Sequence, residues 1–305
     1  IKKTNLKRIN INESLSLSRI IHGYWRASDW NMTIKEMSHF IQSTIELGVT
    51  SFDHADIYGD YTCEALFGNA FQFTSIPRDN IQIITKCGIK LKSEKYADRT
   101  IKTYDYSKNY IINSAEQSIR NLKSSYIDVL LLHRPSPFFD PAEVAEAFSI
   151  LKDQGLVRAF GVSNFLPHHF ELLQTYVDEP LVTNQLEISP YCLEHFENGN
   201  LDFLLKNKIK PMSWSPLAGG QLFNPNDART IRLHEVVSEV ADELGVGAIE
   251  QIVYAWLLKH PTQIMPVIGT GKYDRLKLAC KSLSIDLSME QWYRIYIAST
   301  GQELP

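Results

Sequence analysis

Side chains that could perform acid–base or binding chemistry recur at the carboxyl ends of successive short apolar segments. In chain order, six of these segments end in the following groups: Asp53, Lys86, His133, Ser163 with Asn164, Gln185, and Trp214. If the segments are parallel strands of one sheet, their carboxyl ends meet at one edge, and the six sets of side chains converge there. The ordered series is therefore stronger evidence for a functional site than any one of its members.

The first three members, together with Tyr58, could deliver a proton. A phenol has an ordinary pKa of about 10, so Tyr58 needs a nearby cation to become a useful acid at neutral pH. Lys86 would supply that cation, and Asp53 would hold the ammonium group in place. His133 would donate a hydrogen bond to a carbonyl oxygen. This set suits the reduction of a carbonyl group by hydride, which a cofactor must supply because no side chain donates one.

Each of these residues also has a purely structural interpretation. Asp53 could cap a helix or loop, and Lys86 could be a surface lysine whose stem lies along apolar groups. His133 could be a hydrogen-bonded core histidine, and Tyr58 could be one packing aromatic among the 14 tyrosines. All four structural interpretations would have to hold at one edge of one sheet, which favours the functional interpretation.

The remaining members of the series could seat a nicotinamide ring. Ser163, Asn164 and Gln185 carry neutral hydroxyl and amide groups, which suit a carboxamide. Trp214 offers a flat face on which the ring could stack. The second half of the series therefore predicts a binding site beside the acid–base groups.

A candidate phosphate-binding segment follows the last apolar segment. Gly269-Thr270-Gly271 can present backbone N–H groups, and Lys272 and Arg275 add two cations beside the start of a predicted helix. The 2′-phosphate of NADP(H) suits such a segment. The structural alternative is a solvated Lys/Arg pair that opens a surface helix.

Alternating strand and helix patterns would position these residues. A capping box, Thr33 to Glu36, begins an amphipathic helix that ends at Gly48. Further helices are expected at 110–122 and 141–151, and a hairpin at 7–18. Eight strands are expected, each followed by a helix or a long loop: Arg19–Gly23, Val49–Asp53, Ile81–Lys86, Ile127–His133, Val157–Ser163, Leu181–Gln185, Ile209–Trp214 and Ile264–Ile268.

This alternation predicts an α/β fold, namely a (β/α)8 TIM barrel with an N-terminal β-hairpin, as a single domain over 1–305. A Gly-x-Gly-x-x-Gly motif after the first strand is missing, which argues against a Rossmann dehydrogenase. Segments 193–200 and 221–230 and the tail after Leu287 are expected as loop or terminal additions to the barrel.

The composition excludes several classes of protein. A chain of 305 residues that is 44% hydrophobic and 22% charged is neither disordered, collagen-like nor a coiled coil. Its 31 basic and 35 acidic residues give a net charge of −4 without a long run of one sign. We therefore expect neither a nucleic acid nor a membrane as a partner.

Cysteine usage and the chain's start indicate the compartment. Cys63, Cys87, Cys192 and Cys280 are far apart and show no metal-type spacing, so they are expected to be reduced thiols rather than metal ligands. The segment Ile1–Asn12 lacks the apolar stretch of a signal peptide. We expect a cytoplasmic protein without a metal, and the oligomeric state stays open, with a monomer as the default.

Eight short motifs along the chain resemble those of a known family. Their order is that of the aldo-keto reductases, and within them of the YdhF-like bacterial oxidoreductases. Each fragment alone is weak, but together they are specific and cover nearly the whole chain. The motifs are Gly23-Tyr-Trp-Arg26, Asp53-His-Ala-Asp-Ile-Tyr-Gly59, Ile84-Thr-Lys-Cys-Gly88, Leu131-Leu-His-Arg-Pro135, Gly161-Val-Ser-Asn-Phe165, Asn184-Gln185, Trp214-Ser-Pro-Leu217 and Gly269-Thr-Gly-Lys272.

The resemblance implies a barrel that binds NADPH (or NADP+) across its C-terminal end without a Rossmann fold. It implies a catalytic tetrad of Asp53, Tyr58, Lys86 and His133, with Tyr58 as the proton donor. The implied cofactor contacts are Gly23, Tyr24, Trp25 and Asp53 near the nicotinamide; Ser163, Asn164 and Gln185 for the carboxamide; Trp214 for the ring; Ser215, Pro216, Leu217, Gly219 and Gly220 for the pyrophosphate; and Gly269, Thr270, Gly271, Lys272 and Arg275 for the adenosine phosphate.

Several positions depart from the family pattern. Trp214 stands where family members often have tyrosine, which keeps an aromatic platform. Gly269 stands where many relatives have Lys or Arg, so one phosphate-binding cation is absent or replaced by Lys272. Leu278 and Ala279 replace polar residues that some relatives use against the adenine. NADPH is therefore expected with a smaller margin over NADH than in relatives that hold the extra cation.

The residues and the resemblance together predict an NADPH-dependent oxidoreductase that reduces small aldehydes or ketones and reverses toward alcohol oxidation. The expected substrate contacts are Trp25, Tyr58 and His133, with Tyr24 and Trp30 in an aromatic pocket near the nicotinamide. Such a pocket favours apolar or aromatic carbonyls only weakly. The physiological substrate is not determined by the sequence.

Two other classes of protein stay open. An NADPH-binding sensor or regulatory subunit could keep the tetrad, turn over slowly and dock to a larger partner. A metal-dependent barrel hydrolase is suggested by Asp53-His54-x-Asp56 and by His168-His169. These spacings match no tetrahedral zinc pattern, and the histidine pair opens a predicted helix after Pro167.

Overall fold

A computed structural model describes residues 7–305, which divide into two compact units. The first is the chain up to Asn184 together with Gly269–Tyr273, and the second is Gln185–Ile268 with Asp274–Pro305. Residues 1–6 lie outside the described part. They are the first half of the segment Ile1–Asn12, for which the sequence shows no signal-peptide pattern. The assignment of one domain to 1–305 stays a prediction.

Eight parallel strands form a closed barrel, which confirms the (β/α)8 architecture. In chain order the strands are β3 (Ile21–Gly23), β4 (Ser51–Asp53), β5 (Gln82–Cys87), β8 (Ile127–Leu132), β9 (Val157–Ser163), β10 (Leu181–Glu187), β11 (Met212–Trp214) and β12 (Met265–Ile268). Around the barrel their order is β10-β11-β12-β3-β4-β5-β8-β9. All eight predicted strands are present, and most differ from the prediction by one to three residues at an end.

The predicted hairpin precedes the barrel. Strand β1 (Arg8–Asn10) pairs antiparallel with β2 (Ser16–Ser18), and Ile9 faces Leu17. The Asn12 side chain closes the turn, because its Oδ1 accepts hydrogen bonds from the backbone N–H groups of Ser14 and Leu15. Such Asx-type turns are a common use of asparagine between short strands.

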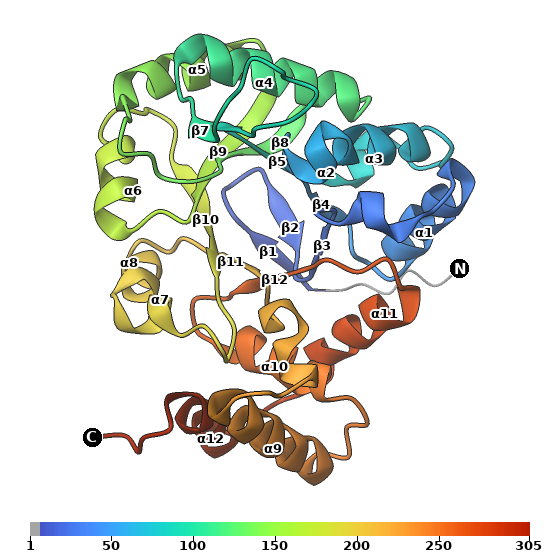
Figure 1. Ribbon diagram of the computed structural model, residues 1–305, viewed down its shortest axis with the longest axis vertical. Helices are drawn as coiled ribbons and strands as arrows, with labels where there is room; N and C mark the ends of the chain where they lie inside the picture. The colour runs from blue at the N-terminus through green and yellow to red at the C-terminus, as the bar shows by residue number, and fades with distance from the viewer. Residues whose placement is uncertain (1–6) are drawn as a thin grey trace. The chain divides into compact units, whose positions relative to one another are not determined.

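The helices of the first unit lie outside its strands; Figure 1 shows α4 and α5 along β5, β8 and β9. Helix α1 begins with the predicted capping box, in which Thr33 Oγ1 accepts from the Glu36 N–H and Glu36 Oε2 accepts from the Thr33 N–H. The elements are η1 (Ala27–Trp30), α1 (Ile34–Glu46), α2 (Tyr58–Tyr61), α3 (Cys63–Phe71), η2 (Arg78–Asn80), α4 (Lys108–Asn121), α5 (Pro141–Asp153) and α6 (Pro167–Gln174).

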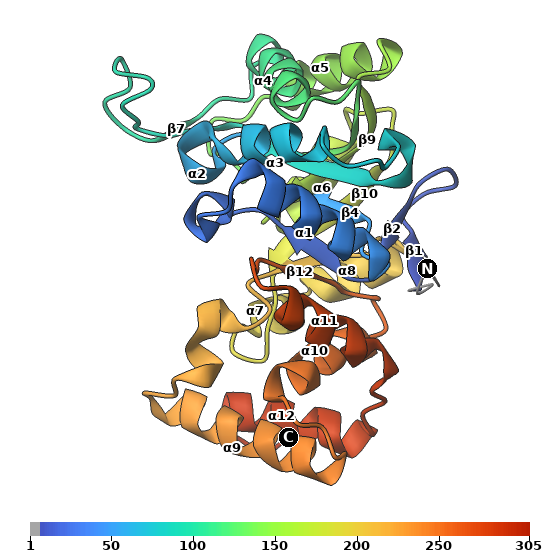
Figure 2. The same ribbon diagram turned by 90° about the vertical axis from the view of Figure 1, so that its right-hand side faces the viewer.

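A long excursion between β5 and α4 was not predicted from the sequence. It carries the two-stranded ribbon β6 (Ile89–Lys90) and β7 (Thr103–Tyr104), and Figure 2 shows the segment between these strands projecting away from the helices. Gly88 starts the excursion with φ of +107°, and a Cβ there would lie 1.9 Å from the Tyr106 ring. Only glycine fits this position, for both reasons.

The second unit contains most of the remaining helices, and α9 and α12 lie side by side (Figures 1 and 2). At its core the rings of Trp256 and Trp292 stack 4.8 Å apart, and each indole N–H donates to the other residue's backbone carbonyl. The elements are α7 (Glu194–Glu197), α8 (Asn200–Lys206), η3 (Ala218–Phe223), α9 (Ala228–Glu243), α10 (Ile249–Lys259), η4 (Ser282–Ser284) and α12 (Met289–Thr300); α11 (Tyr273–Lys281) begins at the last residue of the first unit.

The expected loop additions contain helical elements. Segment 193–200 includes α7, and the tail after Leu287 is largely α12, which Ser288 caps by accepting from the Gln291 N–H. Apolar side chains on one face of α12, such as Trp292 and Ile295, are buried, so packing stabilises this helix. Within residues 7–305, no helix is long and apolar enough to cross a membrane.

Strand boundaries differ most around β10 and β11. Strand β10 continues two residues past Gln185, which therefore lies inside the strand, opposite Met212, rather than at its end. Strand β11 begins only at Met212, three residues after the predicted start at Ile209. Pro211 precedes it, and a proline has no N–H to donate to a neighbouring strand.

Candidate active site

Three neighbouring strands bring the four predicted catalytic residues together in the first unit. Asp53 is the last residue of β4, Lys86 lies in β5, and His133 directly follows β8. Strand β5 pairs with β4 on one side and with β8 on the other, so these positions lie at the same end of adjacent parallel strands. Tyr58 opens the short helix α2, five residues after Asp53.

The Lys86 ammonium group is the centre of the site. It is fully buried and lies 2.8 Å from each carboxylate oxygen of Asp53, 2.8 Å from the His54 carbonyl and 3.0 Å from the Tyr58 hydroxyl. An ammonium group has three protons, which these four acceptors share. The predicted pairing of Lys86 with Asp53, and its contact with the tyrosine hydroxyl, are therefore present in the structure.

The electrostatics of the site follow from burial and from this ion pair. Burial by itself would lower the pKa of Lys86, but the Asp53 carboxylate and the Tyr58 hydroxyl more than offset it and raise the pKa above its ordinary value. Burial raises the pKa of Tyr58, and the nearby Lys86 charge acts in the opposite direction. At neutral pH the lysine is charged and the phenol keeps its proton, as a proton donor requires.

His133 completes the set as a neutral imidazole. Its ring lies edge-on to that of Tyr58 at 5.9 Å, and only 9% of the residue is exposed. Burial, and next the charge of Lys86, lower its pKa well below the usual range. Its Nδ1 atom is enclosed without a hydrogen-bond partner. A neutral imidazole donates from one nitrogen only, which suits a hydrogen bond to an uncharged carbonyl.

The motif that suggested a metal-dependent hydrolase does not assemble a ligand set. Asp53 is bound to Lys86, whereas Asp56 Oδ2 accepts from the Ser114 hydroxyl at 2.8 Å. The His54 ring packs against the rings of Tyr24 and Phe67. The three side chains thus face different surroundings, and over residues 7–305 no group of three His, Cys, Asp or Glu side chains is arranged to hold a metal ion.

Two carboxyl groups, those of Asp56 and Glu64, lie next to the site; the sequence offered Asp56 only as a possible metal ligand and did not single out Glu64. Asp56 Oδ1 is buried without a hydrogen-bond partner. Glu64 is 1% exposed and accepts hydrogen bonds from Thr85 at 2.6 Å and from Asn121 at 3.3 Å. Burial, and next the charge of Glu64, raise the pKa of Asp56 to about 8, and burial also raises that of Glu64. The one feature of the sequence that could have indicated a carboxyl group close to the site was the position of Asp56, two residues before Tyr58.

Asp56→Asn is expected to flatten the pH dependence of stability. Because the folded pKa lies near 8 and the ordinary value is 3.8, the folded chain keeps a proton that the unfolded chain releases between these values. The free energy of unfolding should therefore fall as pH rises through this window, by at most about 1.4 kcal/mol per pH unit from this group. Urea unfolding from about pH 5 to pH 8 measures the slope.

The asparagine variant keeps an acceptor for Ser114 and removes only the titration. The matched control is Asp98→Asn, which changes an exposed carboxyl group in the same unit and should leave the slope as it is. Equal slopes in the wild type and in Asp56→Asn would show that Asp56 is ionised in the folded protein.

The predicted cofactor residues of the first unit are Asp53, described above, and residues in three further places: the end of β9, the end of β3 and the segment 269–272. Ser163 ends β9 and is buried, and Asn164 follows with φ of +61°, its amide donating to the His133 carbonyl at 3.2 Å and to Ser163 Oγ at 2.9 Å. Tyr24 is fully buried in an aromatic cluster, whereas Trp25 is 55% exposed. Gly23 ends β3. The segment 269–272 follows β12 as a loop.

The predicted cofactor residues of the second unit lie in β10, at the end of β11, in the segment that follows β11, and in α11. The Gln185 amide nitrogen lies 3.8 Å from the Met212 sulfur. Trp214 is the last residue of β11 and is partly exposed. Four of the residues that follow β11 have positive φ, namely Ser215, Ala218, Gly219 and Gly220. Arg275 lies in α11 and is exposed. Pro216 is buried and Leu217 is partly buried.

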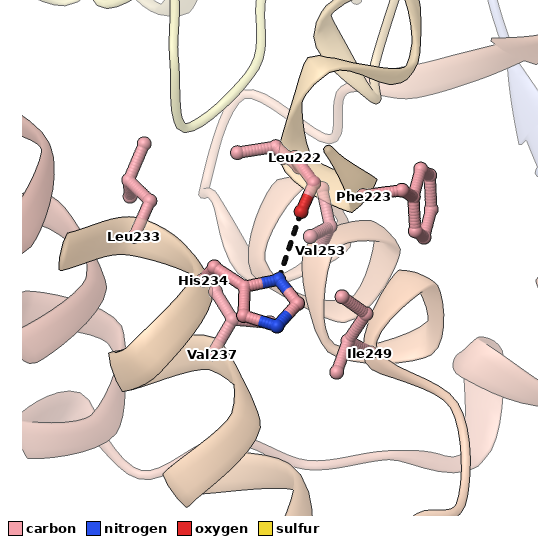
Figure 3. Close-up of a pocket in the computed structure, with 7 residues that line it drawn as sticks. All are labelled: Leu222, Phe223, Leu233, His234, Val237, Ile249 and Val253. Carbon is pink, nitrogen blue, oxygen red and sulfur yellow. Dashed lines mark hydrogen bonds between the residues drawn. The ribbon is translucent and has the colours of Figure 1, made fainter. Parts of the chain in front are cut away.

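One apolar depression lies elsewhere in the second unit, between η3, α9 and α10 (Figure 3). Its lining includes Phe223, Val237 and Ile249, and the His234 ring, whose Nδ1 donates to the Leu222 carbonyl at 3.0 Å. It leaves no room for a water molecule. We interpret it as a packing gap, which contains none of the predicted site residues.

Comparisons with known proteins agree with this geometry. The model of the aldo/keto reductase family matches residues 19–299. The uncharacterized oxidoreductase YcsN of Bacillus subtilis (strain 168) is 46% identical over 98% of this chain and 100% of its own. Oxidoreductase YdhF of Escherichia coli (strain K12) is 44% identical, over 94% and 95%. A 6-dehydroglucose reductase of Agrobacterium fabrum is 37% identical, over 98% and 100%.

A solved structure supports the fold independently. The thermostable aldo-keto reductase Tm1743, crystallised with the inhibitor epalrestat, superposes with a TM-score of 0.81 at 23% identity, over 96% of this chain and 100% of its own. The barrel, the family match over most of the chain and the full-length relatives agree with one another. This chain belongs to the aldo/keto reductase family.

Proposed function

We propose that this protein is an NADPH-dependent reductase of small aldehydes and ketones, with Tyr58 as the proton donor. One observation carries the proposal: the buried Lys86 ammonium group joins the Asp53 carboxylate to the Tyr58 hydroxyl, 3.0 Å away. A buried cation beside a phenol has an evident chemical use, because it stabilises the phenolate that forms when the proton leaves.

The chain's own residues then have separate tasks. The nicotinamide, when bound, supplies the hydride. The neutral His133 donates a hydrogen bond to the substrate oxygen and orients it toward Tyr58. The phenol transfers its proton to that oxygen as negative charge develops on it, and Lys86 stabilises the phenolate left behind. Asp53 keeps the ammonium group charged and aimed. In alcohol oxidation the same groups act in reverse.

The residues present fit a dinucleotide with a 2′-phosphate. For the carboxamide we propose Ser163, Asn164 and Gln185, whose side chains are uncharged donors and acceptors. For the ring we propose Trp214, which is partly exposed, and as further contacts to the nicotinamide we propose Gly23, Tyr24, Trp25 and Asp53. For the pyrophosphate we propose the loop Ser215–Gly220, since a run of positive φ values is typical of backbone segments that bind anions. For the adenosine phosphate we propose Gly269–Lys272 with Arg275.

The substrate class is a small carbonyl compound. Trp25 is more than half exposed and lies two residues after the end of β3, so its indole is available to contact a substrate. The similarity to a 6-dehydroglucose reductase adds a hexose-derived aldehyde to the compounds worth testing. The four cysteines are free, which fits the cytoplasmic location that we propose.

The first experiment follows the reduced-nicotinamide absorbance with protein, NADPH and a reactive aromatic aldehyde, and repeats it with NADH. We expect sustained oxidation of NADPH and slower oxidation of NADH. A single oxidation event per chain would instead favour an NADPH-binding sensor. If neither cofactor bound, the proposed function would be wrong.

Arg275→Ala is expected to weaken NADPH about 10- to 100-fold and NADH less than about twofold. A charge-assisted hydrogen bond contributes about 1.5–3 kcal/mol, and only NADPH carries the 2′-phosphate that would accept it. Fluorescence titration of both cofactors measures the two dissociation constants. Lys277→Ala is the matched control, because Lys277 is also exposed but lies two positions further along α11, on another face. Equal weakening of both cofactors by Arg275→Ala would contradict the assignment.

A further inference from the structure

A buried histidine in β3 belongs to an aromatic cluster in the first unit. His22 is fully buried, and its ring stacks on that of Trp30, with centroids 5.6 Å apart and the planes within 7°. Tyr24 and Phe40 contact the same imidazole edge-on, at 4.8 and 5.2 Å. The catalytic proposal uses neither His22 nor Trp30 as a contact to the reacting groups.

The His22 ring forms one long-range hydrogen bond. Its Nε2 lies 2.9 Å from the backbone carbonyl of Thr270, 248 positions along the chain. A carbonyl oxygen only accepts, so Nε2 carries the proton and donates it. Burial lowers the pKa of His22 to about 4, so the ring is neutral at physiological pH and keeps this tautomer. The bond therefore fixes the Thr270 carbonyl against β3.

Trp30 supports the next residue of the same loop. A Cβ placed on Gly271 would lie 2.6 Å from Trp30 Cγ and 2.9 Å from Cδ1 and Cδ2. Such distances are too short for real atoms, so the Gly271 backbone rests directly on the indole. Two rings that stack on each other thus hold two consecutive residues, Thr270 by a hydrogen bond and Gly271 by contact. The Lys272 N–H, next along, donates to Thr270 Oγ1 at 3.2 Å.

We propose that His22 and Trp30 are positioning residues that hold the Gly269–Lys272 loop in the conformation that receives the cofactor's 2′-phosphate, and so determine the preference for NADPH over NADH. The inference rests on the proposed function. A loop that binds an anion through backbone N–H groups must be ordered when it binds, and a loop that is ordered beforehand loses less entropy on binding. NADH lacks the phosphate and gains little from this order.

His22→Leu removes the donor, and His22→Gln keeps an amide donor near the position of Nε2. The loss of one part-buried hydrogen bond, whose carbonyl acceptor is left unpaired, corresponds to about a tenfold change in an equilibrium constant. We expect His22→Leu to weaken NADPH about tenfold and NADH less than about twofold, and His22→Gln to recover most of the loss. Fluorescence titration measures both dissociation constants. Amide hydrogen exchange of segment 269–273 without cofactor should be about tenfold faster in His22→Leu.

A matched control separates positioning from general damage to the cluster. Phe40→Leu removes a ring that contacts both His22 and Trp30, and its side chain makes no hydrogen bond to the loop. It should lower the melting temperature and leave both the ratio of the two dissociation constants and the exchange of 269–273 as in the wild type. If His22 only stabilised the fold, His22→Leu would also lower the melting temperature and leave the ratio of dissociation constants and the exchange of 269–273 unchanged. That result would overturn the inference.

Gly271→Ala tests the second contact from the loop itself. The added methyl group must displace the indole or the loop, so NADPH should again weaken about tenfold relative to NADH. Unchanged NADPH binding in both Gly271→Ala and His22→Leu would overturn the inference while the proposed function stood. Failure of the wild-type protein to bind NADPH would overturn the proposed function and this inference with it.

Discussion

Tyr58→Phe is expected to lower kcat for carbonyl reduction about a thousandfold, while the dissociation constant for NADPH changes less than about twofold. The substitution removes one hydroxyl group, which accepts a hydrogen bond from Lys86 at 3.0 Å. The ring of the phenylalanine can keep the edge-on contact with His133, whose centroid lies 5.9 Å from that of the tyrosine. Single-turnover kinetics with NADPH and an aromatic aldehyde measure the chemical step.

The control for this variant is Tyr61→Phe. Tyr61 lies three residues further on in α2, and its hydroxyl accepts from the Leu91 N–H and from Arg99, both outside the tetrad. Its loss should affect the fit of the excursion that follows β5 and leave the chemical step near its wild-type rate. If Tyr58→Phe turned over as fast as the wild type, another group would have to deliver the proton, and the proposed mechanism would be wrong.

The pKa of Tyr58 is raised above its ordinary value, which makes the phenol a weaker acid but still suits a proton donor in carbonyl reduction. Burial raises it, and Lys86 acts in the opposite direction without reversing it. A donor must hold its proton until the substrate oxygen becomes basic, and a phenol with a raised pKa does so at neutral pH. Lys86 matters at the later moment, when the phenolate forms and its charge needs a buried cation.

The parts of the fold that follow from local patterns were predicted correctly. The strand that ends at Asp53 and the helix that Thr33 caps are set by periodicity and capping, which a single sequence displays. Lys86, within an apolar strand, had to be either buried with a partner or exposed at the barrel's end, and the structure buries it against Asp53. The gathering of Asp53, Lys86 and His133 could be inferred because each lies at or next to the carboxyl end of a strand, whereas the catalytic role of these residues and of Tyr58 stays a proposal.

The parts that were missed depend on contacts between distant segments. The hydrogen bond from His22 to Thr270 joins positions 248 residues apart, and no local pattern indicates that these two residues pair. Asp56 suggested only a possible metal ligand in the sequence, and the hydrogen bond from Ser114 of α4 together with the buried Oδ1 shows that its carboxyl group is enclosed. Gln185 was placed at a strand end, but β10 continues because the residues after it remain in pairing register with β11.

The Lys86–Asp53 pair also bears on stability, because both groups are almost completely removed from water. Lys86 is 0% exposed and Asp53 is 2% exposed, and the ammonium contacts both carboxylate oxygens at 2.8 Å. A buried ion pair contributes little net stability compared with a well-packed apolar pair of similar size. Loss of one partner is a different matter, because the other then carries an uncompensated charge in a dry site.

Lys86→Met is accordingly expected to lower the free energy of unfolding by about 3–5 kcal/mol, since it leaves the Asp53 carboxylate buried without its cation. Adding Asp53→Asn removes that charge, so the double variant should regain about 2 kcal/mol or more. Urea unfolding of the two single variants, the double variant and the wild type measures the coupling. Both variants that lack Lys86 should be nearly inactive, so stability returns in the double variant without activity.

A loss below about 1 kcal/mol in Lys86→Met at neutral pH would mean that water reaches Asp53, and that the low-polarity site on which the phenolate argument depends does not exist.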